Sequence, residues 1–375
     1  IARMERQQLT YDLLKTPENF FKHVKRLSAS VAAIVIFGHR APTPDSFWST
    51  CVYDAMGIIN PALEPGSYLP IEQFPILKYI PDFLAPSKAR AKKAYRGNTA
   101  IYTEAQRRVE ARRKEGDDRN SIADRILSGS IKLESKWSAT ETSNYFAVFH
   151  EAASDTTANM TLTDILYLAK NPWVQDKAQE ELDRVCGHRM PVWEDFKDLP
   201  YINCIVKEGL RIRPVVPTGI PHRVSRDDWY AGYLIPKDST IYLPAHSLNR
   251  LCPDPDTYNP DRYLQHPKLA MDYAGSPDYE NRDHYAYGSG RRICVGIHLA
   301  ERTQWRIIAR LLWAFRIEPE RDGDGREVQI EGRYREELLV QPEPFRVRFV
   351  PRSEVHVRVV QEGYRASREF LRKWE

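Results

Sequence analysis

The chain has 375 residues, with 55 lysines and arginines against 51 aspartates and glutamates, which leaves a net charge of +4. A chain of this length can bury a large core, and so small a basic excess gives no reason to expect a nucleic-acid partner. The five cysteines are scattered without a Cys-x-x-Cys pair, so they predict no disulfide framework and indicate a reducing compartment.

The first third of the chain predicts helices on either side of a proline-rich segment. Residues 1–40 have helical patterns, and Gly38 is expected to close the second helix. Residues 60–87 are rich in proline and apolar side chains and predict a loop packed on the body, whereas residues 88–130 are charged and helical. The most apolar early run, residues 28–38, is too short to cross a bilayer.

A long helix is predicted over residues 140–170. Ser138 followed by Glu141 forms a capping box at its start, and Asn171-Pro172 stops it. Apolar residues occupy almost a whole turn near its middle, which predicts burial there.

An acid and an alcohol, Asp155 and Thr156, lie inside this helix within the segment 152–157. Polar side chains in such a place are costly unless they are used or satisfied. The simpler alternative is that the Thr156 hydroxyl bonds back to the carbonyl four residues earlier and that Asp155 faces solvent. The helix alone does not decide between these two interpretations.

The next segments predict two helices and then short strands. Residues 173–188 form an amphipathic pattern, and a further helix begins at Pro200 and ends before Pro214. Alternation and turn residues over 221–264 predict hairpins, and strands are again expected from residue 326 onward, at 328–330, 338–340 and 345–350.

Glu208 and Arg211 on the helix that begins at Pro200 are three residues apart, so they share a face and can pair. Taken alone, this pattern is most simply a solvated ion pair, which contributes less than about 1 kcal/mol.

The most informative residue is Cys294, within the glycine-flanked loop 287–296. Gly288 and Gly290 allow a tight reversal of the backbone, and the residues that follow the loop are apolar at helical spacing. We therefore expect the thiol at a loop-to-helix junction, where backbone N–H groups and the helix dipole favour the thiolate. Such a thiolate is a good axial ligand for haem iron.

Two neighbours of Cys294 suit the same use. Gly296 has no side chain, so the new helix can lie against a flat ring, and Arg292 can pair with a carboxylate at the ring edge. The alternative for a lone cysteine is a buried structural thiol in a glycine-rich turn.

The complete ten-residue pattern resembles the haem-binding loop of the cytochrome P450 family of haem-thiolate monooxygenases. The family usually has Phe where this chain has Tyr287, an aromatic replacement that should preserve the shielding of the sulfur. Three further family marks follow the expected order: the acid-alcohol segment 152–157, the Glu208-x-x-Arg211 pair, and the hairpin region 221–264. The resemblance implies a mainly α fold with small antiparallel β-sheets.

The resemblance also implies roles for single residues. Cys294 would be the metal ligand, and Thr156 and Asp155 would deliver protons during O₂ activation. The substrate would enter the distal side under Ala152 and Thr156. By position, Arg223 looks like the residue that pairs with a haem propionate, and His222 is a weaker candidate.

In the family, the Glu208 and Arg211 pair is buried and locks onto a downstream arginine that matches Arg262 here. These three residues would then brace the haem-binding loop.

For the whole protein, the resemblance implies haem b, electrons from NADPH through a flavoprotein reductase, and a small apolar substrate. It implies the cytosolic face of the endoplasmic reticulum membrane, and the style of the chain is similar to fungal secondary-metabolism members. Residues 1–375 would form one domain, the C-terminal part of an enzyme whose N-terminal anchor, first strands and B and C helices are not in this chain.

Two alternatives remain open. One is an O₂-independent haem-thiolate isomerase or dehydratase, although such enzymes generally lose the alcohol that this chain keeps as Thr156. The other is a non-catalytic or haem-poor fragment.

Overall fold

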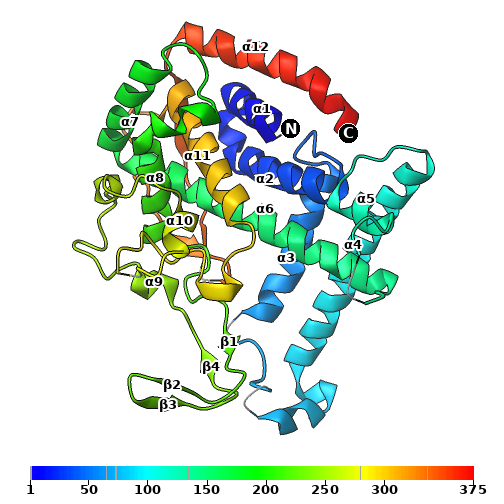
Figure 1. Cartoon of the computed structure of the whole chain (residues 1–375). Helices are drawn as coiled ribbons and strands as arrows, with labels where there is room; N and C mark the ends of the chain where they lie inside the picture. The colour runs from blue at the N-terminus through cyan, green and yellow to red at the C-terminus, as the bar shows by residue number, and fades with distance from the viewer. Residues whose placement is uncertain (1, 65, 72–73, 133–134, 279, 336) are drawn as a thin grey trace. The chain divides into compact units, whose positions relative to one another are not determined.

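The computed structural model describes residues 2–64, 66–71, 74–132, 135–278, 280–335 and 337–375 (Figure 1). Pro65 and residues 72–73 of the expected proline-rich loop lie outside this description. The backbone contacts divide the chain into two compact units. Unit 1 comprises Ile1–Leu162, Glu336–Leu338 and Arg346–Glu375, and unit 2 comprises Thr163–Arg335 and Leu339–Phe345. The expectation of a single domain stays a prediction.

Unit 1 is almost entirely helical. Its elements are α1 (Ala2–Lys15), η1 (Pro17–Asn19), α2 (Phe20–Phe37), α3 (Phe47–Leu63), η2 (Pro75–Tyr79), η3 (Asp82–Leu84), α4 (Pro86–Lys114), α5 (Ile122–Leu127), the greater part of α6 (Ala139–Lys170), β8 (Val347–Pro351), α12 (Glu354–Leu371) and η7 (Arg372–Trp374).

Aromatic side chains fill the core of unit 1. The Phe37 ring lies 5.1 Å from Trp48 and 5.7 Å from Phe146, centroid to centroid, and both pairs are buried. Gly38 ends α2 as expected, with φ 72° and its N–H bonded to the Ile34 carbonyl. Glycine adopts this left-handed conformation without the strain that a side chain would add.

Helix α12 follows the last strand of unit 1 and was missed by the sequence patterns. It lies alongside α1 in Figure 1, and the Tyr11 and Tyr364 rings stack 3.9 Å apart. The Ser353 side chain accepts a hydrogen bond from the His356 N–H and so caps the helix. This Ser-capped start is the signal from which the helix could have been predicted.

Unit 2 holds the remaining elements. They are the end of α6, α7 (Pro172–Val185), η4 (Trp193–Lys197), α8 (Pro200–Ile212), β1 (His222–Arg223), β2 (Asp228–Tyr230), β3 (Tyr233–Ile235), β4 (Thr240–Ile241), α9 (Ala245–Leu248), η5 (Pro260–Tyr263), α10 (Ala270–Ala274), η6 (Gly290–Arg292), α11 (Ile297–Ala314), β5 (Phe315–Pro319), β6 (Tyr334–Arg335) and β7 (Gln341–Pro342).

Helices α8 and α11 form the centre of unit 2. Every residue of α8 from Tyr201 to Ile212 is buried, and α11 packs against α7, α8 and α10 with Trp305 and Trp313 inside. The strands of the unit are short antiparallel pairs, β1 with β4, β2 with β3 and β6 with β7. The mainly helical fold with small antiparallel sheets is therefore confirmed.

The expectations for the end of the chain were less accurate. Of the three expected strands, only 345–350 corresponds to one, β8. Residues 328–330 form no strand, because pairing there stops at a single bridge between Arg321 and Glu327. The expected strand at 338–340 is replaced by β7, Gln341–Pro342.

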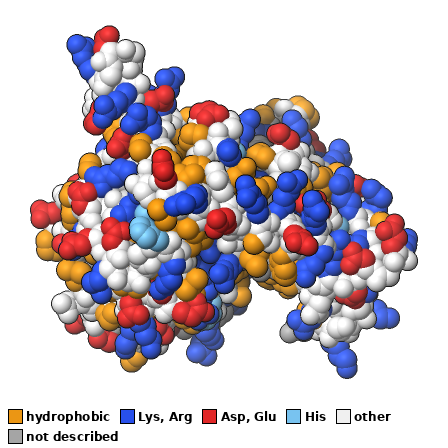
Figure 2. Space-filling model, turned by 90° about the horizontal axis from the view of Figure 1, so that it is seen from above, with side chains coloured by type: hydrophobic (Ala, Val, Ile, Leu, Met, Phe, Trp, Pro, Cys, Tyr) orange, Lys and Arg blue, Asp and Glu red, His pale blue; other side chains and the backbone are white. Residues whose placement is uncertain are grey.

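The capping box of α6 is confirmed: the Ser138 N–H donates to Glu141 Oε2 at 2.7 Å, and the Glu141 N–H donates to Ser138 Oγ at 3.2 Å. None of the described helices has the length and apolarity that a bilayer crossing requires. Basic and acidic side chains are intermixed over the face shown in Figure 2, as the small net charge leads one to expect.

Candidate functional site

Cys294 is a free, solvent-exposed thiol in the loop between η6 and α11. Its N–H donates to the Tyr287 carbonyl at 2.9 Å, and its own carbonyl accepts from the Ile297 N–H at 3.2 Å, which starts the helix. Gly288 and Gly290 have φ values of 75° and 67°. The expected reversal and loop-to-helix junction are therefore present, and the alternative of a buried thiol is wrong.

The electrostatics of this sulfur differ from the expectation. Burial by neighbouring atoms raises the pKa of the Cys294 thiol, and the Gly296 N–H opposes this shift only in part. The loop by itself therefore favours the neutral thiol, because a single backbone donor does not offset desolvation of the anion. A bound metal ion reverses this preference, since a coordinating thiol is deprotonated.

The surroundings of Cys294 fit a flat group with an anionic edge. A Cβ added to Gly296 would lie 3.8 Å from the sulfur, so glycine keeps the space beside it open. Arg292 is exposed and has no hydrogen-bond or ion-pair partner among the residues that the structure describes, which leaves its guanidinium available to a carboxylate. Thiol, guanidinium and glycine together fit the haem that the resemblance implies.

The pair on α8 is buried, so its interpretation as a solvated pair is wrong. Arg211 Nε and Nη2 each lie 2.7 Å from a carboxylate oxygen of Glu208, and Arg262 Nε reaches Glu208 Oε1 at 3.4 Å. Both members of the pair on α8 are essentially inaccessible to solvent. A bidentate contact of this kind fixes orientation as well as charge.

These three residues hold the backbone of segment 249–259. Arg211 donates to the carbonyls of Pro255 and Thr257 at 3.0 and 3.2 Å. Glu208 Oε1 accepts from the Asn259 N–H at 2.8 Å. The hydrogen bonds of these three residues thus end on this segment and do not reach the thiol loop itself.

A second set of contacts holds the residues that lead into the thiol loop, together with Ser289 inside it, and was missed by sequence reasoning. Asn249 Oδ1 accepts from the Tyr285 N–H at 2.8 Å, and Lys207 Nζ lies 2.9 Å from Asp283 Oδ2. Arg282 donates to the His284 carbonyl at 2.9 Å and to Ser289 Oγ at 3.1 Å. The sequence showed Lys207 beside Glu208 and Asp283 shortly before the loop, but a single charged residue does not identify its partner.

The acid-alcohol segment of α6 combines both earlier interpretations. Thr156 Oγ1 donates to the Ala152 carbonyl at 2.7 Å, which is the back-bonded alternative. Asp155, however, is only 5% exposed, so the expectation that it faces solvent in that alternative is wrong. Burial raises the pKa of Asp155, and the positive charge of Lys25 opposes this shift.

Lys25 and Tyr53 lie beside this acid in unit 1. Tyr53 OH donates to the Lys25 carbonyl at 2.9 Å, and Lys25 Nζ lies 4.9 Å from the centre of the Tyr53 ring. Burial and the charge of Asp155 raise the pKa of Tyr53 well above its usual range. The acid thus has a phenol and an ammonium group as polar neighbours.

Arg223 lies on β1 and is solvent-exposed. Its Nε donates to Asp238 Oδ1 at 2.7 Å, and its Nη2 donates to the same oxygen. This guanidinium is therefore already engaged, unlike that of Arg292. His222, next to it, is also exposed.

Unit 2 thus brings together Cys294, Arg292, Gly288 and Gly296 on one loop, and unit 1 presents Asp155 and Thr156 on one helix. The meeting of these two groups around one cofactor stays a prediction.

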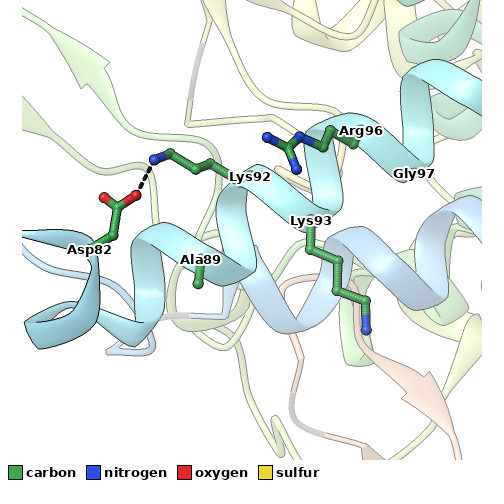
Figure 3. Close-up of a pocket in the computed structure, with 6 residues that line it drawn as sticks. All are labelled: Asp82, Ala89, Lys92, Lys93, Arg96 and Gly97. Atoms are coloured by element: carbon green, nitrogen blue, oxygen red, sulfur yellow. Dashed lines mark hydrogen bonds and ion pairs between the residues drawn. The ribbon is translucent and has the colours of Figure 1, made fainter.

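A surface pocket in unit 1 contains none of these residues. Figure 3 shows it beside α4, with Lys92 paired to Asp82 and with Lys93 and Arg96 on the same helix. We assign no part of the predicted chemistry to it.

Comparison with known proteins gives a consistent result. The family described as Cytochrome P450 matches residues 11–349. The chain is 40% identical to Cytochrome P450 monooxygenase yanC of Aspergillus niger over 387 aligned residues, 100% of this chain and 72% of the relative. It is 38% identical to Cytochrome P450 monooxygenase macC of Penicillium terrestre, over 99% of this chain and 72% of the relative. It is also 38% identical to Cytochrome P450 monooxygenase atE of Aspergillus terreus, over 84% of this chain and 59% of the relative.

Proposed function

Because the chain belongs to the cytochrome P450 family, we propose that it binds haem b through the Cys294 sulfur and uses O₂ to hydroxylate or otherwise oxidise a small apolar organic substrate. The enzyme is a monooxygenase of that family, as its relatives are. The observation that carries the proposal is the exposed free thiol of Cys294 on a loop with two left-handed glycines.

The loop residues have separate tasks in this proposal. Cys294 supplies the metal ligand, Gly288 and Gly290 shape the reversal that presents it, and Gly296 keeps the adjacent surface flat. Arg292 pairs with a carboxylate at the haem edge through its free guanidinium. Arg223 can pair with a haem carboxylate only if its ion pair with Asp238 opens or is shared. Bound haem supplies the electron transfer and O₂ activation.

Asp155 and Thr156 hold and pass protons in this proposal. The raised pKa of Asp155, caused by burial, keeps a proton on the carboxyl at higher pH than usual, which suits a proton donor. The Thr156 hydroxyl donates its hydrogen bond to the Ala152 carbonyl. Its oxygen therefore remains an acceptor that can orient a water or a protonated group.

The substrate meets α6 along the face that carries Thr156. Val148 and Ala152 precede Thr156 by eight and four residues, so the three share one side of the helix. Val148 is 63% exposed and Ala152 is exposed, although neighbouring positions of α6 are buried. A small apolar stripe of this kind supports an apolar substrate.

The remaining proposals follow from family membership. Electrons come from NADPH through a flavoprotein reductase, and the protein works on the cytosolic face of the endoplasmic reticulum membrane. Both units belong to one cytochrome P450 domain, and the substrate belongs to fungal secondary metabolism.

The test is the absorption spectrum of the reduced, CO-bound holoprotein. We expect the Soret band that is characteristic of thiolate ligation, and we expect Cys294→Ala to abolish it, because the loop then contains no thiol. Cys186→Ala, at a buried cysteine of the same unit, is the matched control and should leave the band in place. A band that survives Cys294→Ala would reject the ligand assignment.

A further inference from the structure

Unit 2 contains a buried ion pair that the proposed chemistry does not use. Lys207 on α8 has no solvent exposure, and its Nζ lies 2.9 Å from Asp283 Oδ2, whose side chain is 1% exposed. The ammonium group also lies 4.4 Å from the centre of the Tyr273 ring. Charges this deeply buried are retained in a protein only with close partners.

Asp283 is fixed on its other sides as well. Its Oδ1 accepts from the His284 N–H at 2.9 Å, and its carbonyl accepts from Tyr263 OH at 3.0 Å. His284 and Lys207 lower the pKa of Asp283 more than burial raises it, so the carboxylate stays ionised. Side chain and backbone of this residue are therefore both held in place.

Three hydrogen bonds hold the segment that follows Asp283, and the last of them ends on the backbone of Cys294. The Tyr285 N–H donates to Asn249 Oδ1 at 2.8 Å, and the Gly288 N–H donates to the Tyr285 carbonyl at 2.9 Å. The Tyr287 carbonyl then accepts from the Cys294 N–H at 2.9 Å. The backbone position of Cys294 thus depends on the segment between Asp283 and Tyr287.

Helix α8 is connected to the segment between Asp283 and Tyr287 by two side chains. Lys207 makes the first connection, through Asp283. Asn249 makes the second, because its Nδ2 donates to the Leu210 and Arg211 carbonyls of α8 at 3.3 Å each. The Glu208–Arg211 pair on the same helix contacts segment 249–259 instead. Among the residues that the structure describes, the ion pair between α8 and the segment leading into the loop is therefore the one made by Lys207.

An apolar pair of similar volume would fill this space with less desolvation, so stability alone does not explain two buried charges. Buried ion pairs are retained in some proteins because they specify one arrangement of the chain. We propose that Lys207 and Asp283 are positioning residues that set how the loop presents the Cys294 sulfur to haem. This inference rests on the proposed function, since it concerns the geometry of the same ligand.

The test compares three variants of the haem-loaded protein. Lys207→Met removes one charge, and Lys207→Met/Asp283→Leu replaces the pair by apolar side chains. Lys177→Met is the matched control, because Lys177 and Asp261 form a lysine–aspartate pair of 2.8 Å in the same unit at a partly exposed site. Asp283→Asn, which keeps the size of the side chain, serves if Lys207→Met does not fold.

Two readouts are taken for each variant: the thermal unfolding temperature, and the ratio of thiolate-type to shifted Soret band in the reduced CO complex. The ratio is measured on protein whose circular dichroism matches that of the wild type. We expect Lys207→Met or Asp283→Asn to lower the ratio about tenfold or more, the scale on which outer partners of a metal ligand act. The double variant should recover unfolding temperature but not the ratio.

A double variant that recovers both readouts, or a ratio in Lys207→Met that equals that of Lys177→Met, would overturn the positioning role. Absence of the thiolate-type band in the wild type would instead reject the proposed function, so the two failures are distinguishable.

Discussion

The two parts of the proposed site are built by different means. The Cys294 loop has little regular structure, and polar side chains hold the segment that leads into it: Lys207, Asn249 and Arg282. The Asp155 and Thr156 segment lies inside a helix of 32 residues, whose backbone ladder holds it without help from these side chains. A loop depends on its partners for geometry, whereas a helix supplies geometry on its own.

This difference separates two kinds of substitution. Removing one supporting charge beside the loop should alter ligand geometry and stability together, because its partner then stays buried without a counterion. Changes within the α6 segment should alter proton delivery and leave the fold intact, because Thr156 contributes one local back-bond.

The largest expected effect comes from Glu208→Gln. Glu208 accepts from both Arg211 nitrogens at 2.7 Å and from the Asn259 N–H at 2.8 Å, with no solvent exposure. Removing its charge leaves Arg211 buried without a counterion, which should cost about 3–5 kcal/mol of unfolding free energy. Urea unfolding measures this, and a loss below about 1 kcal/mol would show that the pair behaves like a surface pair.

The next effect concerns pH. Burial raises the pKa of Glu301 to about 7, so the folded state binds a proton that the unfolded state has already lost. The contribution of Glu301 to the unfolding free energy is fully present below its pKa of 4.5 in the unfolded chain. It is lost as pH rises from about 4.5 to about 7, the pKa of Glu301 in the folded protein.

Glu301→Gln should therefore flatten the decline in unfolding free energy between about pH 5 and about pH 8, by roughly 2 kcal/mol. Chemical denaturation at both pH values measures the slope. An unchanged slope would contradict the burial of a protonated carboxyl at this position.

Features of the fold that depend on a few neighbouring residues could be predicted from the sequence. The Ser138 capping box, the stop at Pro172 and the closing Gly38 are local signals, and each is confirmed. The loop-to-helix junction at Cys294 is confirmed as well, since glycine and apolar spacing are also local.

Burial and pairing at long range were predicted less well. The pair of Lys207 with Asp283 joins positions 76 residues apart, and nothing in either segment identifies the other. The raised thiol pKa of Cys294 depends on how many atoms surround the sulfur, which the fold decides. The burial of Asp155, which the sequence left open between two interpretations, depends on the fold for the same reason.

A smaller effect is expected from Thr156→Ala. Alanine is a better helix former, so stability should not fall, while product formed per NADPH should drop about tenfold as peroxide is released instead. Thr161→Ala is the matched control, because Thr161 Oγ1 makes the same back-bond, to the Thr157 carbonyl at 2.9 Å. Equal coupling in the two variants would remove the proton-relay role of Thr156.

The smallest effect is expected from Asp238→Asn. The pair of Arg223 and Asp238 is exposed, so its loss should change unfolding free energy by less than about 1 kcal/mol. If the released Arg223 serves a haem propionate, haem retention in a competition assay should rise or stay equal. A marked loss of haem would show that Asp238 holds Arg223 in its working position.

The central claim is that the Cys294 sulfur is the protein ligand of a haem iron. Electron paramagnetic resonance of the ferric holoprotein tests it most directly, because the signal depends on the axial ligand. We predict the low-spin signature of thiolate ligation. A histidine-ligated signature, which the exposed His298 at the start of α11 could supply, would contradict the claim.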